Sequence, residues 1–493
     1  MYATPAARQL PQMVGNIAGI RVVEPPEQWL GDYLAPGNVA SIVDWLTRPP
    51  AQHANAFVIS TDMLAYGGLG PSRIPDDVST SEAIARLQPL RSLRARKPKA
   101  WITAFGTVIR LEPTVVVPVG AATTYSAIAQ PPTWQYIWDY AQLHNPPLAD
   151  EEERARHLRE LIGPKVLGEY LQARARDRDV DLAVMHLVAD GTLDRAVIGA
   201  DDAGPVGLHV RDVHALQHAV EELGISDRAS IEPGADELGS VLVAHAMARM
   251  IQWTPQIAVR YSTPNGAATQ DPLEFAPISV TIDDIVQLCG GVRDDARPDV
   301  VLYLRVPGTT VAQDAALLHN LSYEIRAGHS VALVDLTFLE RSYDSQAAFV
   351  RQMLRLSIAG KLDAYSSWNT DANSVGIALS EVVAVGVGRR AATYDPLAHG
   401  AFMLDRYIDD YLYHDIVRPK LNAYLTERGV PDHEYLAPDV AQEANRKLRE
   451  LIDPLASELL RELYPEYQAA KLSIGLPWPR TFEIESDIRL APG

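Results

Sequence analysis

The chain has 493 residues, with 44 Lys or Arg against 63 Asp or Glu, and its formal net charge at pH 7 is −19. This acidic balance argues against nucleic-acid and anionic-membrane partners, because both are bound through clustered Lys and Arg. No apolar run is long enough for a transmembrane helix, and the first residues lack the pattern of a signal peptide. The single cysteine, Cys289, cannot form an internal disulfide, so we expect a cytoplasmic protein.

Short β-branched segments alternate with helical patterns over the first 400 residues. Strands are predicted at Phe57–Ser60, Ala100–Phe105, Ala196–Ile198, Ala229–Ile231, Ile257–Tyr261, Val300–Leu304, Val331–Val334 and Leu362–Tyr365. Helices are predicted at residues 151–178, 210–223, 237–252, 310–327 and 343–359. Alternation of this kind is typical of a parallel sheet. We expect an α/β fold, specifically a TIM-barrel-like (β/α) barrel, and a doubly wound open parallel sheet is the alternative.

The pattern changes near residue 400. We therefore expect a barrel-like catalytic domain over residues 1–400 and a C-terminal helical region over residues 401–493. Helices are predicted at residues 405–425 and 440–463, with Pro419 and Pro454 kinking or splitting them. The Pro-rich segment 475–482 is expected to pack against the protein as an extended strap.

The third predicted strand ends at two adjacent carboxylates, Asp201 and Asp202, which a Gly/Pro-rich turn follows. Residues at the carboxyl end of a strand face the ligand site of α/β proteins. Two neighbouring carboxylates repel each other when both are ionised, so one pKa should rise, which suits a general acid. The structural alternative is that one Asp caps the next helix and the other binds a turn amide.

Polar residues also follow the first two predicted strands. Asp62, Tyr66 and Arg73 lie in a glycine-rich segment after the first strand, where they could contact a ligand. The alternative is a glycine turn with an Asp cap. Arg110 follows the second strand and could reach the same pocket or simply pair with Glu112.

Further candidates follow later strands. His209 comes shortly after the paired aspartates, and Asp236 follows the fourth strand at the start of a helix. Trp368, Asn369 and Asn373 follow the last predicted strand, and a Trp ring with amide side chains is a common way to bind a sugar. The alternative for this stretch is a core Trp and an Asn N-cap.

Other chemistries have weak support. The sequence has no His-Glu-x-x-His motif, no Cys pair and no Gly-x-Ser-x-Gly motif. We therefore expect neither a metal site nor another cofactor.

Five motifs together resemble a bacterial family called domain of unknown function 4127, namely residues 60–69, 199–209, 233–237, 367–376 and 478–483. The resemblance spans nearly the whole chain, but the family name implies no activity. Members of that family usually begin with a strand that carries a Pro-Leu-Asp-(Glu/Ser)-Arg-Pro motif. This chain begins just after the position of that motif, so we expect either a misassigned start or the loss of a first strand.

A more distant, local likeness concerns the chemistry. Adjacent aspartates at a strand end, with a later Trp-Asn stretch, are similar to the site of the family-84 β-N-acetylglucosaminidases. The likeness implies that Asp201 orients the substrate acetamido group, which attacks the anomeric carbon, and that Asp202 is the acid/base. Asn369 and Asn373 would bind sugar hydroxyls.

These observations predict a glycoside hydrolase acting on a small carbohydrate or glycoside. A non-catalytic carbohydrate-binding protein and a metal-dependent amide or phosphate hydrolase using Asp62, Asp201 and Asp202 are the alternatives. We expect Asp62, Asp201, Asp236 and Asn369 to converge on one end of the sheet or barrel. Whether the chain forms a homo-oligomer is left open.

Overall fold

The chain folds into two compact units, each with its own parallel sheet. The computed structural model describes residues 5–31, 35–74, 78–113, 132–337, 343–367 and 369–493. Unit 1 comprises Val23–Gly239 and Pro272–Ala276, and unit 2 comprises residues 5–22, Ser240–Asp271 and Pro277–Gly493. The two units do not meet at the domain boundary that we expected near residue 400. That boundary stays a prediction.

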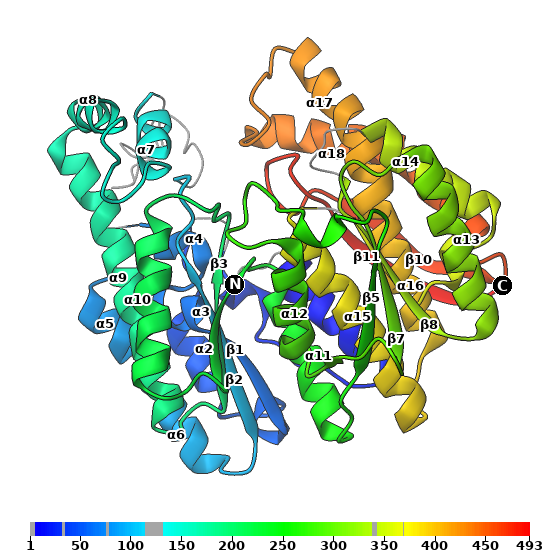
Figure 1. Cartoon of the computed structure of the whole chain (residues 1–493), viewed down its shortest axis with the longest axis horizontal. Helices are drawn as coiled ribbons and strands as arrows, with labels where there is room; N and C mark the ends of the chain where they lie inside the picture. The colour runs from blue at the N-terminus through cyan, green and yellow to red at the C-terminus, as the bar shows by residue number, and fades with distance from the viewer. Residues whose placement is uncertain (1–4, 32–34, 75–77, 114–131, 338–342, 368) are drawn as a thin grey trace. The chain divides into compact units, whose positions relative to one another are not determined.

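The sheet of unit 1 has four parallel strands in the order β1-β2-β3-β4, namely β1 (Ala56–Ser60), β2 (Trp101–Val108), β3 (Arg195–Ala200) and β4 (Ala229–Pro233). The long helix α9 (Pro164–Ala189) packs on β2 and β3, and α10 (His209–Glu222) packs on β2 and β4 (Figure 1). The remaining α-helices within unit 1 are α2 (Val39–Trp45), α3 (Thr61–Tyr66), α4 (Leu69–Ser72), α5 (Thr80–Ala85), α6 (Pro89–Arg96), α7 (Thr133–Ala141) and α8 (Glu152–Ile162).

The core of unit 1 explains why these strands are almost continuously apolar. Ile102 of β2 and Ile198 of β3 are fully buried and belong to one hydrophobic cluster with Val184 and Val188 of α9. Strands covered on both faces have no solvent side, so they lack the alternation of polar and apolar residues. A second, smaller cluster joins α7, α8 and the start of α9.

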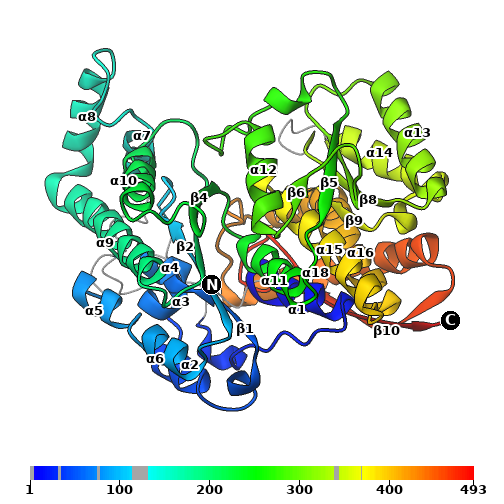
Figure 2. The same ribbon diagram turned by 60° about the horizontal axis from the view of Figure 1, so that its bottom comes forward.

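The sheet of unit 2 has five parallel strands in the order β6-β5-β7-β8-β9, namely β5 (Gln256–Tyr261), β6 (Val292–Arg293), β7 (Val300–Arg305), β8 (Ser330–Asp335) and β9 (Ala364–Ser366). Helix α15 (Asp371–Ala391) packs on β8 and β9 (Figure 2). The other α-helices of this unit are α1 (Leu10–Ile17), α11 (Leu238–Met250), α12 (Ile278–Leu288), α13 (Val311–Ala327), α14 (Tyr343–Arg355), α16 (Pro396–Arg406), α17 (Arg418–Glu427) and α18 (Pro438–Leu463).

The C-terminal part of unit 2 adds a π-helix and a hairpin to this sheet. The π-helix η8 (Tyr407–Val417) connects α16 to α17, and the antiparallel hairpin of β10 (Tyr467–Gly475) and β11 (Glu485–Pro492) packs on α18 and α16. Tyr407 of η8 stacks on Tyr365 of β9, with ring centroids 4.2 Å apart. The C-terminal elements therefore share one hydrophobic core with the sheet.

The mixed α/β fold with parallel sheets is confirmed, and each of the eight predicted strands overlaps an observed one. A closed barrel is not confirmed, because the described parallel strands belong to two separate sheets. The sequence analysis missed β6 and the C-terminal hairpin. Gly163, with φ of 82°, ends α8 inside the helix predicted at residues 151–178, whereas α18 continues through Pro454. Across the part of the chain that the structure describes, we find no helix with the length and apolar character needed to span a membrane.

Candidate functional site

The segments that follow β1, β2 and β3 bring four of the predicted site residues together as two ion pairs in unit 1. Nη2 of Arg73 lies 2.5 Å from Oδ2 of Asp201, and Nη1 of Arg110 lies 3.2 Å from Oδ2 of Asp202. The Arg73 side chain is 7% exposed, whereas those of Asp201 and Asp202 are 18% and 28% exposed. Both carboxylates are thus held by arginines and still reach solvent.

The backbone at the end of β3 has an unusual conformation at Asp202 and very close packing at Gly199. Asp202 has a φ of 43°, in the left-handed region that Asp and Asn adopt more readily than most other residues. Gly199, two residues before the pair, has no room for a side chain, because an added Cβ would lie 2.2 Å from the carbonyl oxygen of Gly234. The turn after β4 therefore packs directly on β3 beside the aspartates.

The environment of Asp202 favours its protonated form. Burial raises the pKa of Asp202, and the neighbouring charge of Asp201 raises it further, whereas Arg110 and Arg73 oppose the rise. A carboxyl group that keeps its proton longer than an ordinary Asp can donate it to a leaving group. The carboxyl of Asp201 faces the more deeply buried arginine of the two.

Asp62 lies near this pair in the first turn of α3. Its Oδ2 accepts a hydrogen bond from the Thr107 hydroxyl at 3.0 Å. Burial raises the pKa of Asp62 to about 6, while Thr107 and Arg73 oppose the rise and Asp201 adds to it. The N-cap of α3 is Ser60, whose hydroxyl oxygen accepts from the Met63 amide, so Asp62 is not the cap.

Three further predicted residues of unit 1 lie in other surroundings. Tyr66 is buried, with the Arg176 guanidinium 4.9 Å from its ring centroid. His209 is buried, and its Nε2 lies 2.6 Å from the carbonyl oxygen of Gly204. Burial lowers the pKa of His209 to about 4, so the ring is neutral at pH 7 and Nε2 donates this hydrogen bond. Asp236 is partly buried in the segment between β4 and α11. As substrate contacts, these three residues stay predictions.

Two buried acidic residues on α9 escaped the sequence analysis. Asp177 and Asp181 are almost fully buried, and Oδ1 of Asp181 lies close to Gly106 of β2. Burial raises the pKa of both groups well above the ordinary value, and the charge of Asp62 raises both further. Asp177 also raises the pKa of Asp181 by charge repulsion. Charged residues four apart on a helix usually mark an exposed face, so the sequence carried no signal that these two are buried.

These raised pKa values predict that stability falls as pH rises. Between the unfolded pKa near 4 and the folded value, the folded state keeps a proton that the unfolded state has lost, so each group removes up to about 1.4 kcal/mol per pH unit. Asp181, which faces Asp177, Asp62 and Asp212, should show this effect clearly. We expect Asp181→Asn to gain stability relative to the wild type between pH 5 and pH 8, measured by urea unfolding.

Asp179→Asn is the matched control, because Asp179 lies on the same helix and its side chain is 46% exposed. Its stability difference from the wild type should be the same at both pH values. A difference for Asp181→Asn that does not change with pH would show that Asp181 is ionised in the folded protein.

The predicted sugar-binding residues after the last parallel strand belong to unit 2. Asn369 precedes α15 with a φ of 75°, and Asn373 is buried in the first turn of that helix. Trp368 lies outside the described residues. Convergence of these residues with the aspartates of unit 1 stays a prediction.

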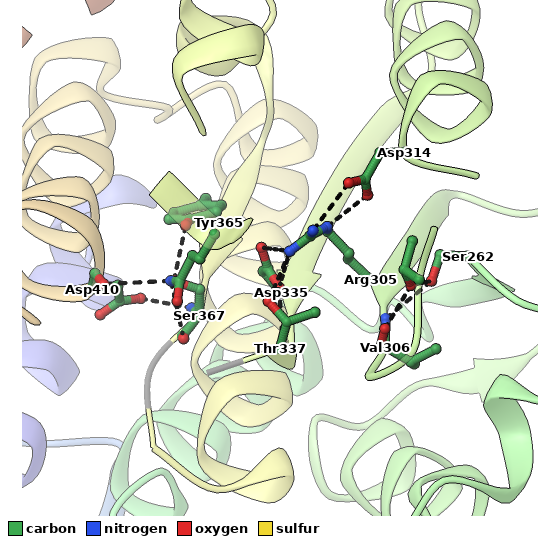
Figure 3. Close-up of polar contacts among 11 residues, drawn as sticks. Ser262, Arg305, Val306, Asp314, Asp335, Thr337, Tyr365, Ser367 and Asp410 are labelled. Atoms are coloured by element: carbon green, nitrogen blue, oxygen red, sulfur yellow. Dashed lines mark hydrogen bonds and ion pairs between the residues drawn. The ribbon is translucent and has the colours of Figure 1, made fainter. Parts of the chain in front are cut away.

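A buried ionic network follows β7 and β8 in unit 2, as Figure 3 shows. Nη1 of Arg305 lies 3.0 Å from Oδ2 of Asp335 and donates to the Thr337 hydroxyl at 2.7 Å. Nε of the same guanidinium lies 2.7 Å from Oδ1 of Asp314. Arg305 and Asp335 are the last residues of their strands, so the strand-end reasoning applied to Asp201 would have found them.

The π-helix adds acidic groups to the same region of unit 2. Oδ2 of Asp410 accepts from the Ser367 amide at 2.8 Å, and the Tyr365 hydroxyl donates to the Ser367 hydroxyl at 2.8 Å (Figure 3). Burial raises the pKa of Asp415 to about 8, with Asp335 and Asp410 adding to the rise. Among the described residues, no group of three or more His, Cys, Asp or Glu side chains is arranged to hold a metal ion.

A family model described as "protein of unknown function (DUF4127)" matches residues 4–487. The chain belongs to this family. The match confirms the resemblance carried by the five motifs. Comparisons with curated proteins and with solved structures found no match. The likeness to family-84 enzymes, which rests on the paired aspartates and the later Trp-Asn stretch, stays a prediction.

Proposed function

We propose that this protein is a glycoside hydrolase, with Asp202 as the acid/base and Asp201 as the group that orients the substrate. The observation that carries the proposal is the pair of adjacent carboxyls at the end of β3, which are partly exposed and held by two different arginines. Unequal surroundings of two carboxyls are the usual basis for assigning one as acid and the other as a charged group.

In the proposed reaction, protonated Asp202 donates its proton to the glycosidic oxygen as the bond to the anomeric carbon breaks. The carbonyl oxygen of the substrate's 2-acetamido group attacks that carbon, and the Asp201 carboxylate holds the acetamido N–H. Asp202, now ionised, then takes a proton from the water that opens the cyclic intermediate. The raised pKa of Asp202 supports the first step, because the acid must be protonated before it donates.

The two arginines support this assignment through geometry. Arg73 and Arg110 each fix one carboxyl, and fixed side chains lower the cost of reaching a reactive geometry. The proposal does not need a closed barrel, since ligand sites lie at the carboxyl ends of strands in open parallel sheets as well. Binding of sugar hydroxyls by Asn369 and Asn373 and a cytoplasmic location are parts of the same proposal.

The test is turnover of nitrophenyl glycosides by the purified full chain, comparing sugars that carry a 2-acetamido group with the same sugars that carry a hydroxyl. We expect turnover of the acetamido sugars only, because the hydroxyl sugars lack the internal nucleophile. Equal turnover of both would remove the assisted mechanism. Binding of the acetamido sugar without turnover would show a carbohydrate-binding protein, and activity that is lost with EDTA and restored by Mg²⁺ would show a metal-dependent hydrolase.

A further inference from the structure

The long helix α9 contacts both segments that carry the arginine partners of the paired aspartates. Arg73 lies just after α4, and Arg110 lies just after β2, far apart in the sequence. Buried side chains of α9 bind the backbone of both segments. These contacts lie within unit 1 and involve residues that the sequence analysis did not identify.

The contacts to the Arg110 segment involve three consecutive residues. Nη1 of Arg174 donates to the carbonyl oxygens of Ile109 and Arg110, at 2.7 Å and 3.0 Å. The Ile109 amide donates to Oδ2 of Asp177 at 3.2 Å, and the Tyr170 hydroxyl donates to the Leu111 carbonyl oxygen at 2.8 Å. The backbone that positions Arg110 is thus fixed from one side by a single helix face, because residues 170, 174 and 177 follow its periodicity.

The contacts to the Arg73 segment come from Arg176. Its Nη1 donates to the carbonyl oxygen of Val78 at 2.8 Å, and its Nη2 donates to that of Ser72, the residue before Arg73. Tyr66 lies under the same guanidinium. A buried arginine that binds two backbone carbonyls fixes the path of a loop, because both bonds require one orientation of its planar group.

Arg174 is itself held in place by α10. Its Nε and Nη2 donate to Oδ2 of Asp212 at 3.2 Å and 2.9 Å. Burial opposes the charge of Arg174, but Tyr170 and Asp212 raise its pKa, so it stays charged. A buried charge that is fully paired adds little net stability and can instead fix one arrangement of its neighbours.

We propose that α9 is the positioning element of the site, with Arg174, Asp177 and Tyr170 placing Arg110 against Asp202, and Arg176 placing Arg73 against Asp201. The catalytic consequence rests on the proposed function, whereas the placement of the two segments does not. The contacts of α9 with the Arg110 segment and its contacts with the Arg73 segment are the two branches of this proposal. Each branch can be tested without the reaction and without the other branch.

The first experiment measures amide hydrogen exchange by mass spectrometry in Tyr170→Phe, which removes only the hydroxyl that binds Leu111. We expect the peptide containing residues 103–112 to exchange roughly 3- to 10-fold faster than in the wild type, because one backbone anchor is lost. Tyr413→Phe is the matched control, since the buried Tyr413 hydroxyl donates to the Thr481 carbonyl oxygen in unit 2. Unchanged exchange of residues 103–112 in Tyr170→Phe would overturn the positioning role for Arg110.

The second experiment uses a glycoside that the wild type hydrolyses. In Tyr170→Phe, a looser Arg110 should raise the pKa of Asp202, so the alkaline limb of the pH profile should move upward by roughly half a pH unit. In Arg176→Lys, which replaces the planar two-armed guanidinium by a single ammonium group, kcat should fall roughly 10-fold whatever the leaving group, because Asp201 is misplaced. Equal pH profiles in Tyr170→Phe and Tyr413→Phe would overturn the catalytic consequence.

The hydrogen-exchange measurement also tests the contacts of Arg176, and it stays informative if the protein hydrolyses no glycoside. Arg176→Lys should speed exchange of residues 69–74 and leave residues 103–112 unchanged, and the reverse pattern would contradict the assignment of the two branches. If the wild type hydrolyses no glycoside, the proposed function fails, while the exchange data still decide whether α9 holds the two segments.

Discussion

Replacing Asp202 by Asn is expected to lower the hydrolysis of an unactivated acetamido glycoside on the order of 10²- to 10⁴-fold, because an amide cannot donate a proton to the leaving oxygen. The loss should be much smaller for a nitrophenyl glycoside, whose leaving group needs little protonation. Asn has nearly the same shape as Asp and can still accept from Arg110, so the fold should be kept. Steady-state kinetics on both substrates, with circular dichroism as a check of folding, measure this effect.

Asp201→Asn is the matched comparison, because it changes the neighbouring residue in the same way. Its loss should persist whatever the leaving group, since the acetamido group needs a charged partner in every case. Equal losses in both variants on both substrates would remove the acid/base assignment of Asp202. Unchanged rates in both variants would remove the paired aspartates from the mechanism.

Replacing Arg305 by Met is expected to destabilise unit 2 by about 3–5 kcal/mol, because it removes the buried guanidinium that pairs with Asp335 and Asp314 and leaves both carboxylates without that charge. The Arg305 side chain is 0% exposed and pairs with Asp335, also 0% exposed, and with Asp314. Met has a similar volume, so little of the loss would come from a cavity. Urea unfolding at pH 7 measures the change.

Arg260→Met provides the control for this prediction. Arg260 forms an ion pair with Asp295 in the same unit, but both side chains are largely exposed, and such pairs contribute about 0–1 kcal/mol. The two variants should therefore differ by several kcal/mol. A loss below about 1 kcal/mol for Arg305→Met would mean that Asp335 and Asp314 become protonated or hydrated at little cost.

The sequence by itself determined the local elements of this protein. Eight strand positions were predicted correctly, because strands buried on both faces consist of short runs of apolar, β-branched residues. The paired aspartates were found for a related reason: Asp201 and Asp202 interrupt such a run at its carboxyl end. The family was recognised from motifs that keep their order along the chain, which needs no structure.

Only the tertiary structure decided how these elements are grouped and which charges meet. Alternating strands and helices fit one barrel as well as two open sheets, and only long-range pairing separates the two, because each strand is equally apolar in both. Arg73 and Asp201 are 128 residues apart in the sequence, and Arg110 and Asp202 are 92 residues apart. No local sequence pattern extends over such separations.

The same reason explains the residues that the sequence analysis missed. Arg174 and Asp177 belong to types that usually lie on the surface, so the sequence alone predicts that such residues on a helix are exposed. Their roles depend on burial, which withdraws water and makes each charge dependent on one particular partner. Apolar periodicity is a property of neighbouring residues, whereas the desolvation of a charge depends on which distant elements pack around it.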